Sequence, residues 1–270
     1  MMLSYRVTVA GVALGMLASS PGYAADPTSR SQGGTSFTVG LGVAMTPDYD
    51  GSNDYRIWPA GFLRFSNLYH PATYVQIAGP GFESNLIPDD HWRMGVVASF
   101  NTSYRHVDDR AVKRLRRPES GLQAGFVIGY DFSGRPDAER VLEVRATYDV
   151  LHGNGFLITP RAHGSVPLTA DLSLGAGVSV TWASSNYMSN RFGISGSDSL
   201  RSGLRPFKAG SGFKDFGLDV SLTYSLSQRW ALTGFASYQL LLGDAAKSPI
   251  VKDRGNRNNV TSGLVVSYTF

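Results

Sequence analysis

The fold is decided by residues 172–182, which read LSLGAGVSVTW. Apolar side chains occupy every second position of this stretch, and the positions between them hold only Ser, Gly and Thr. Alternation at period two places one set of side chains on each face of an extended strand. The stretch is long for a strand of a globular domain, but its length suits a tilted crossing of a bilayer.

The same alternation recurs at residues 122–132, 142–150 and 216–226. The second face again carries many Gly, Ser and Thr residues, which fits a narrow lumen better than open solvent. Aromatic residues gather near the strand ends, as in the interfacial girdles of membrane barrels: Phe37, Tyr130, Phe132, Tyr148, Trp182, Phe216, Tyr224 and Trp230. Charged residues make up only 17% of the chain, below the roughly 25% of a typical soluble domain.

Ten longer segments and two short ones have strand character. The longer ones are residues 37–45, 56–66, 93–104, 121–132, 141–150, 155–168, 172–183, 213–225, 230–241 and 260–270, and the short ones are residues 74–77 and 82–87. We therefore predict an all-β fold, a transmembrane antiparallel up-and-down β-barrel of about twelve strands, with about ten as the alternative.

The connections between these segments are of two lengths. Residues 169–171 and 227–229 are tight turns, which we assign to the periplasmic rim because membrane barrels keep their short turns there. Residues 46–54, 105–120, 184–211 and 243–259 form longer loops, which we assign to the outer face.

The N-terminus has the pattern of a cleaved secretory signal. Arg6 precedes an apolar stretch, and Gly22 and Ala24 supply the small residues required before a signal-peptidase cut. The apolar stretch is too short to span a bilayer as a helix. We predict a signal peptide at residues 1–24 with cleavage between Ala24 and Ala25, a flexible leader at residues 25–35 and a barrel at residues 36–270, located in the cell outer membrane.

The C-terminus is the most specific local signal. Leu264, Val266, Tyr268 and Phe270 share one face of the last predicted strand, and the chain ends on the aromatic residue. Such a terminus resembles the insertion signal that barrel-assembly machinery reads on outer-membrane proteins. That machinery, outer-membrane lipid and lipopolysaccharide are therefore expected partners.

Two groups of side chains could carry chemistry. His163 and Ser165 lie on one face of a strand at a spacing seen in outer-membrane phospholipases, which leaves a barrel hydrolase open as a minor hypothesis. Asp48, Asp50 and Asp54 with Asn53 could offer oxygen ligands to Ca²⁺, but the same segment also has the composition of an ordinary turn, which we favour.

Other features exclude whole classes of function. The chain has no cysteine, so disulfides, thiolate catalysis and cysteine metal sites are ruled out. It contains no Walker-type loop and no dinucleotide fingerprint, and we expect no cofactor, no metal and no catalytic residue. The basic cluster Lys113, Arg114, Arg116 and Arg117 is interpreted as a solvated loop, with no nucleic-acid partner.

The predicted lumen carries few charges, and both signs are present. They are Asp131, Glu143, Arg145, Asp149, Arg161 and Asp219. In a narrow barrel paired charges mostly fill the interior, so we expect a largely occluded lumen.

Several segments resemble the MltA-interacting protein family, also called MipA/OmpV. They are residues 47–52, 54–56, 181–183, 187–188, 192–194, 212–215, 232–234 and 242–251, among them Pro-Asp-Tyr-Asp-Gly-Ser at residues 47–52 and Gly-Phe-Lys-Asp at residues 212–215. They run from the first predicted strand to the last loop, so the resemblance covers essentially the whole mature chain. The basic loop at residues 110–117 departs from the family's pattern.

The resemblance implies a non-catalytic outer-membrane barrel. It implies a scaffold for peptidoglycan-remodelling enzymes, a lytic murein transglycosylase and a penicillin-binding protein. A channel for small solutes or antibiotics and an adhesin are the alternatives that other members of the family suggest. The family supplies no catalytic residue to carry over to this sequence.

Overall fold

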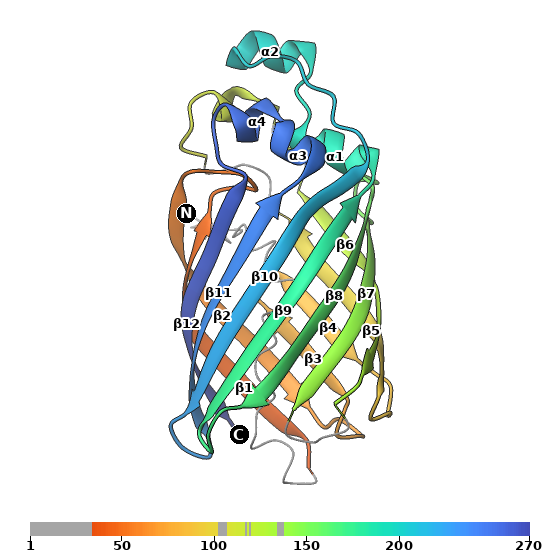
Figure 1. Cartoon of the computed structure of the whole chain (residues 1–270), viewed down its shortest axis with the longest axis vertical. Coiled ribbons are helices and arrows are strands. Elements are labelled where there is room, and N and C mark those ends of the chain that lie inside the picture. The colour runs from red at the N-terminus through yellow and green to blue at the C-terminus, as the bar shows by residue number, and fades with distance from the viewer. Residues whose placement is uncertain (1–33, 102–106, 117, 119, 134–137) are drawn as a thin grey trace, which may run out of the picture.

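Twelve antiparallel strands close into a barrel in which β1 pairs with β12. Figure 1 shows the barrel from the side. This architecture comes from a computed structural model that describes residues 34–101, 107–116, 118, 120–133 and 138–270. The strands are β1 (Ser36–Pro47), β2 (Tyr55–Ser66), β3 (Tyr74–Ala78), β4 (Gly81–Asn85), β5 (Trp92–Asn101), β6 (Gly121–Asp131), β7 (Glu139–Asp149), β8 (Phe156–Pro167), β9 (Leu172–Ala183), β10 (Gly212–Ser225), β11 (Trp230–Leu241) and β12 (Asn258–Thr269). The prediction of about twelve strands is confirmed, and the alternative of ten is wrong.

The two short strands predicted between residues 74 and 87 are the hairpin β3–β4. A tight turn at Gly79, whose φ of 52° favours glycine, joins them. The strand predicted at residues 93–104 ends at Asn101, and residues 102–104 lie outside the described part of the chain, as do the predicted signal peptide, Ala24 and Ala25.

The outer wall of the barrel is apolar. Ile57, Phe126 and Leu264 are exposed by 74%, 72% and 56%, and each alternates with inward-facing neighbours. So large a continuous apolar surface would cause aggregation in water, but it matches the hydrocarbon core of a bilayer. The chain is therefore a transmembrane barrel, located in the outer membrane. Among the described residues, no helix is both long and apolar enough to span a bilayer.

Aromatic rings form the predicted girdle at the rim where β1 begins and β12 ends. Phe37 stacks on Phe65 and on Phe270 with ring centroids 4.5 and 5.6 Å apart, and Phe270 meets Tyr268 at 4.7 Å. Phe270 and Leu264 lie on the outward face of the last strand, as expected for an insertion signal. Recognition by the assembly machinery stays a prediction.

Three of the four long connections predicted as loops contain helices at the opposite end of the barrel (Figure 1). They are α1 (Ser185–Phe192), α2 (Gly196–Ser202), α3 (Gly243–Lys247), α4 (Pro249–Lys252) and the 3₁₀ turn η1 (Val112–Arg114). Ser195 caps α2 in a capping box with Asp198, and Ser248 caps α4, which has proline in its first turn. The short turns at residues 168–171 and 226–229 lie at the other rim, which is therefore the periplasmic rim.

Candidate functional site

Four outer connections fold together into a structure that we call the outer cap, residues 48–54, 107–116, 184–211 and 242–257. Its first apolar cluster is Tyr49, Val107, Val112, Leu115, Ile194, Leu204 and Ile250. A second cluster lies over the ends of β9 and β11 and comprises Ala183, Tyr187, Met188, Phe192, Ala209, Leu241, Ala245 and Val251. Because each cluster draws residues from several connections, the outer cap has a core of its own and is not a set of independent loops.

Close backbone contacts tie the first connection to the last. Gly51 has a φ of 94°, and a Cβ atom there would lie 2.5 Å from Val251 Cγ2. The Gly51 N–H donates to Asn259 Oδ1 at 2.7 Å, and Asn259 Nδ2 donates to the Ser52 carbonyl at 3.1 Å. The position therefore requires glycine, because a side chain would separate the two connections.

A bulge at the outer end of β10 adds an ionic contact. The register against β9 shifts between Phe213 and Asp215, so that Lys214 and Asp215 are both buried while Phe213 faces outward. Lys214 Nζ lies 3.4 Å from Asp50 Oδ2 in the outer cap and also pairs with Asp215. The buried ammonium thus joins the barrel wall to the first outer connection.

The aspartates of residues 48–54 form the turn that the sequence favoured. Asp48 pairs with Arg56 at 2.7 Å, whereas Asp50 turns toward Lys214. The Asp48 N–H donates to the Asp54 carbonyl at 3.0 Å, which closes the turn. Burial raises the pKa of Asp48 above its usual value, against the opposing effect of Arg56. No group of three metal-ligating side chains occurs among the described residues.

The basic loop is solvated on one side only. Lys113, Arg114 and Arg116 are exposed as predicted, and Arg117 lies outside the described residues. Its neighbours Val112 and Leu115 are buried in the first cluster of the outer cap. The Arg116 N–H donates to Asp198 Oδ1 at 2.7 Å. Burial alone would raise the pKa of Asp198, but hydrogen bonds from Ser195 and Arg116 outweigh it and hold the pKa below its usual range.

A network of charged and polar side chains follows the inner wall of the barrel below the outer cap. Arg64 lies over the Tyr74 ring at 4.1 Å, and the Tyr74 hydroxyl donates to Glu83 at 2.6 Å. Glu83 and Glu143 pair with Arg145 at 2.9 and 2.7 Å. The network therefore runs from β2 to β7 along the inside of the wall.

Arg161 extends this network to β10. Its Nη2 atom lies 3.1 Å from both carboxylate oxygens of Asp219, and Nη1 lies 3.9 Å from Glu143. β9 runs between β8 and β10 and contributes Gly177, where a Cβ atom would lie 2.7 Å from Asp219. The glycine on the small-residue face of residues 172–182 thus leaves room for an ion pair between two non-adjacent strands.

All six charges predicted for the lumen are buried inside the barrel. Asp131 pairs with Arg93 at 2.7 Å, and Arg93 also reaches Glu139 at 2.7 Å. Asp149 makes no ion pair among the described residues but accepts from Asn154 at 2.8 Å. The sequence reasoning missed Glu83, Arg93, Glu139 and Lys214, although each lies inward in a predicted strand or next to one.

The wall that closes the barrel is apolar inside. The rings of Phe62 and Phe235 are buried with Ala44, Ala60, Ala78 and Val265. Cβ atoms at Gly40 and Gly263 would lie 2.1 Å from the Phe62 ring and 2.6 Å from the Phe235 ring. These glycines make room for the two rings, which pack between the inner faces of β1, β2, β11 and β12.

His163 belongs to the charged network and not to an outer-wall catalytic site. It faces inward with Nε2 3.3 Å from Glu143 Oε2. Ser165 is buried on the same inward face, and no hydrogen bond between the two is found in the part of the chain that the structure describes. The arrangement lacks the access from the external leaflet that a phospholipase needs.

At the periplasmic rim, two connections pack into a surface that we call the periplasmic knob, residues 67–73 and 86–91. The Tyr69 hydroxyl donates to the Leu86 carbonyl, and His70 Nε2 lies 3.9 Å from Asp90. Asp89 accepts from the N–H groups of His91 and Trp92 at 2.8 and 2.7 Å, and these hydrogen bonds lower its pKa. Tyr69 remains 63% exposed, so the knob presents an aromatic side chain to the periplasm.

Fold and interior together define an outer-membrane β-barrel with a folded outer cap and an ion-paired lumen. The model of the family described as MltA-interacting protein MipA matches residues 39–270. The chain belongs to this family.

Among its relatives is the MltA-interacting protein of Escherichia coli (strain K12), 23% identical over 95% of this chain and 98% of the relative. The protein of the same name from Shigella flexneri matches to the same extent. Among solved structures, an outer membrane channel from Pseudomonas putida F1 is 12% identical, covers 88% of this chain and 96% of its own, and has a TM-score of 0.47. The NanC porin is 11% identical, covers 86% of this chain and 98% of its own, and has a TM-score of 0.45.

Proposed function

We propose that this chain is a non-catalytic scaffold of the outer membrane that binds a murein transglycosylase from its periplasmic side. The observation that carries the proposal is the outer cap, whose buried clusters and Lys214–Asp50 contact join four connections into one folded structure at the outer end of the barrel. We infer that this cap obstructs the outer mouth, which leaves the periplasmic end as the surface for binding partners. The name of the relatives, MltA-interacting protein, is consistent with this.

The periplasmic knob is the surface that we assign to this contact. It holds an exposed tyrosine on an ordered support, and tyrosine is enriched at the energetic centre of protein interfaces. We extend the proposal to a penicillin-binding protein as a second partner, bound by the transglycosylase or by the same rim.

A channel for small solutes or antibiotics is the second candidate function. The charged inner wall favours it, since arginine, glutamate and aspartate side chains line the barrel from β4 to β10. In that case, transport would require the outer cap to open. Liposome swelling with sugars of increasing size distinguishes this function from scaffolding.

The test is binding of a purified soluble murein transglycosylase to the mature chain in lipid nanodiscs. We expect saturable binding that Tyr69→Ala weakens by about thirtyfold, the loss of an interface hot spot. The matched control is Leu200→Ala, because Leu200 is 90% exposed on the outer cap. Absence of binding, or equal weakening by both substitutions, would contradict the proposed function.

A further inference from the structure

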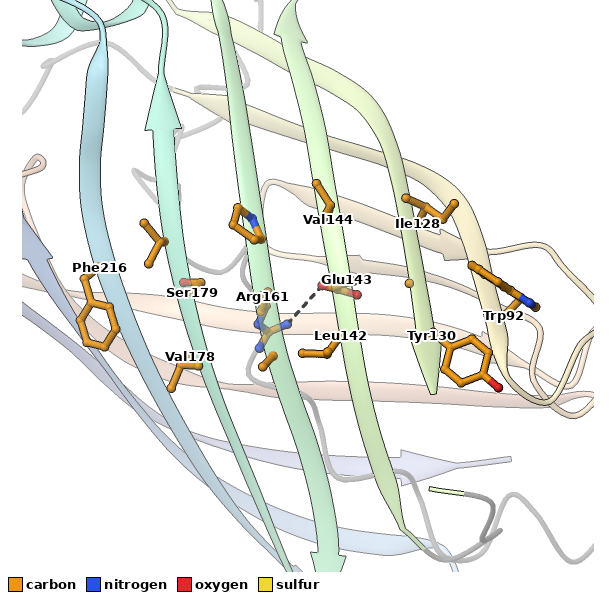
Figure 2. Close-up of a pocket in the computed structure, with 14 residues that line it drawn as sticks. Trp92, Ile128, Tyr130, Leu142, Glu143, Val144, Arg161, Val178, Ser179 and Phe216 are labelled. Atoms are coloured by element: carbon orange, nitrogen blue, oxygen red, sulfur yellow. Dashed lines mark ion pairs between the residues drawn. The ribbon is translucent and has the colours of Figure 1, made fainter. Parts of the chain in front are cut away.

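The lipid-facing wall contains an apolar hollow of about 590 Å³ across strands β5 to β10. Figure 2 shows Trp92 and Tyr130 at one side of it, Leu142 and Val144 between, and Phe216 at the other side. The exposed part of its lining is almost wholly apolar, because Glu143 and Arg161 border the hollow but pair inside the barrel. The hollow therefore lies on the surface that meets hydrocarbon.

Small residues make the floor of the hollow. Pro160 and Ala162 are outward on β8, between the larger Leu142 and Val178 of the neighbouring strands. The ladder between β8 and β9 passes from Ile158 directly to Arg161, because proline has no N–H to donate. The outer surface of the barrel wall is therefore recessed along β8.

One outward-facing cation, Arg140, lies beside this hollow. Arg140 is exposed and shares the outward face of β7 with Leu142 and Val144. It lies two residues toward the periplasmic rim from Leu142, about 7 Å along the strand. In the described parts of the twelve strands, it is the one charged residue on an outward face. No ion pair to its side chain is found among the described residues.

The surroundings of Arg140 leave its guanidinium accessible. Its partner on β8 is Gly164, which has no side chain to cover it. On the other side lie Phe132, 58% exposed, and Tyr130, whose ring stacks on His91 at 5.5 Å. Arginine and aromatic side chains at this depth are the usual anchors at a membrane interface.

From this arrangement we propose a binding site for one anionic glycerophospholipid of the periplasmic leaflet. The guanidinium of Arg140 binds the lipid phosphate, which it can do with two parallel hydrogen bonds. One acyl chain lies in the hollow over Ala162 and Pro160. The site is at the periplasmic end of the wall and so excludes lipopolysaccharide of the opposite leaflet. It is independent of the proposed scaffold function.

Tryptophan quenching by brominated lipids tests this site. The mature chain is refolded into phosphatidylcholine vesicles with increasing fractions of phosphatidylglycerol brominated on its acyl chains. The quenching of Trp92 is obtained as the difference between the unsubstituted chain and Trp92→Phe. This contribution reports on the site because Trp92 lines the hollow. Brominated phosphatidylcholine serves as the neutral lipid.

We expect half-maximal quenching at an about fivefold lower fraction of phosphatidylglycerol than of phosphatidylcholine, the contribution of one interfacial arginine. Arg140→Gln should abolish this difference, and Ala162→Phe should reduce quenching by both lipids. The control is Arg257→Gln, which removes an exposed cation from the outer cap and should change nothing. Heat-modifiability on gels confirms that each variant is folded.

Two results would overturn the proposal. Equal quenching of the unsubstituted chain by both lipids, or an equal effect of Arg140→Gln and Arg257→Gln, would show that Arg140 selects no lipid. Protection of Trp92 from both lipids at every fraction would mean that a second protein molecule covers the hollow.

Discussion

Replacing Asp219 with leucine tests whether the ion pairs of the lumen are held in a dry interior. The side chains of Arg161 and Asp219 are exposed by only 2% and 6%. Without Asp219, the Arg161 guanidinium loses both contacts at 3.1 Å and keeps Glu143 at 3.9 Å. Removing one partner of a buried pair costs about 3–5 kcal/mol, whereas replacing both partners with apolar side chains is close to neutral.

The assay is unfolding by guanidinium chloride in phospholipid vesicles, monitored by tryptophan fluorescence. We expect Asp219→Leu to lower the free energy of unfolding by about 3–5 kcal/mol and the double substitution Arg161→Met with Asp219→Leu to restore most of it. A loss below about 1 kcal/mol for Asp219→Leu, the value of an exposed pair, would refute the reasoning. It would mean that water in the lumen screens the charges.

Three further predictions concern the outer cap and assembly. Ser248 is fully buried and donates to the Phe192 carbonyl at 2.7 Å, so Ser248→Ala should destabilise the outer cap by about 1–3 kcal/mol and speed its cleavage in limited proteolysis. The pKa of Asp198 is lower in the folded chain than in the unfolded chain. The ionised carboxylate therefore stabilises the outer cap at pH values above the pKa of the unfolded chain, and this stabilisation is lost as the pH falls through the pKa of the folded chain. Cleavage of the outer cap should rise below about pH 4, and Asp198→Asn should remove that step. Phe270→Ser should lower the amount of heat-modifiable barrel in outer membranes, because the insertion signal loses its terminal aromatic.

The strands could be predicted because period two is a local property of the sequence. Residues 172–182 alternate without interruption, and each inward glycine or serine follows from its neighbours. The helices of the outer cap could not be predicted in the same way. Tyr187, Met188 and Phe192 are buried by residues of other connections, and these partners are distant in sequence. No local periodicity therefore indicated a helix.

The charged network was predicted only in part for a related reason. Glu143 and Arg145 lie on the inward face of a long, clearly alternating strand, so their position followed from the pattern. Glu83 lies in a strand of five residues, too short for alternation to define a face. Its pairing with Arg145 crosses from β4 to β7 and depends on the closure of the barrel, which the sequence does not encode locally.

If the outer cap closes the barrel, as we propose, the chain acts by binding at its periplasmic rim and not as a channel. Single-channel recording in planar bilayers distinguishes a closed barrel from an open one. A variant in which a short Gly-Ser linker replaces residues 184–211 removes α1 and α2 and serves as the open control. The closed cap predicts a silent unsubstituted chain and conductance steps only in the variant. Stable steps of porin size from the unsubstituted chain would contradict the claim and favour a channel.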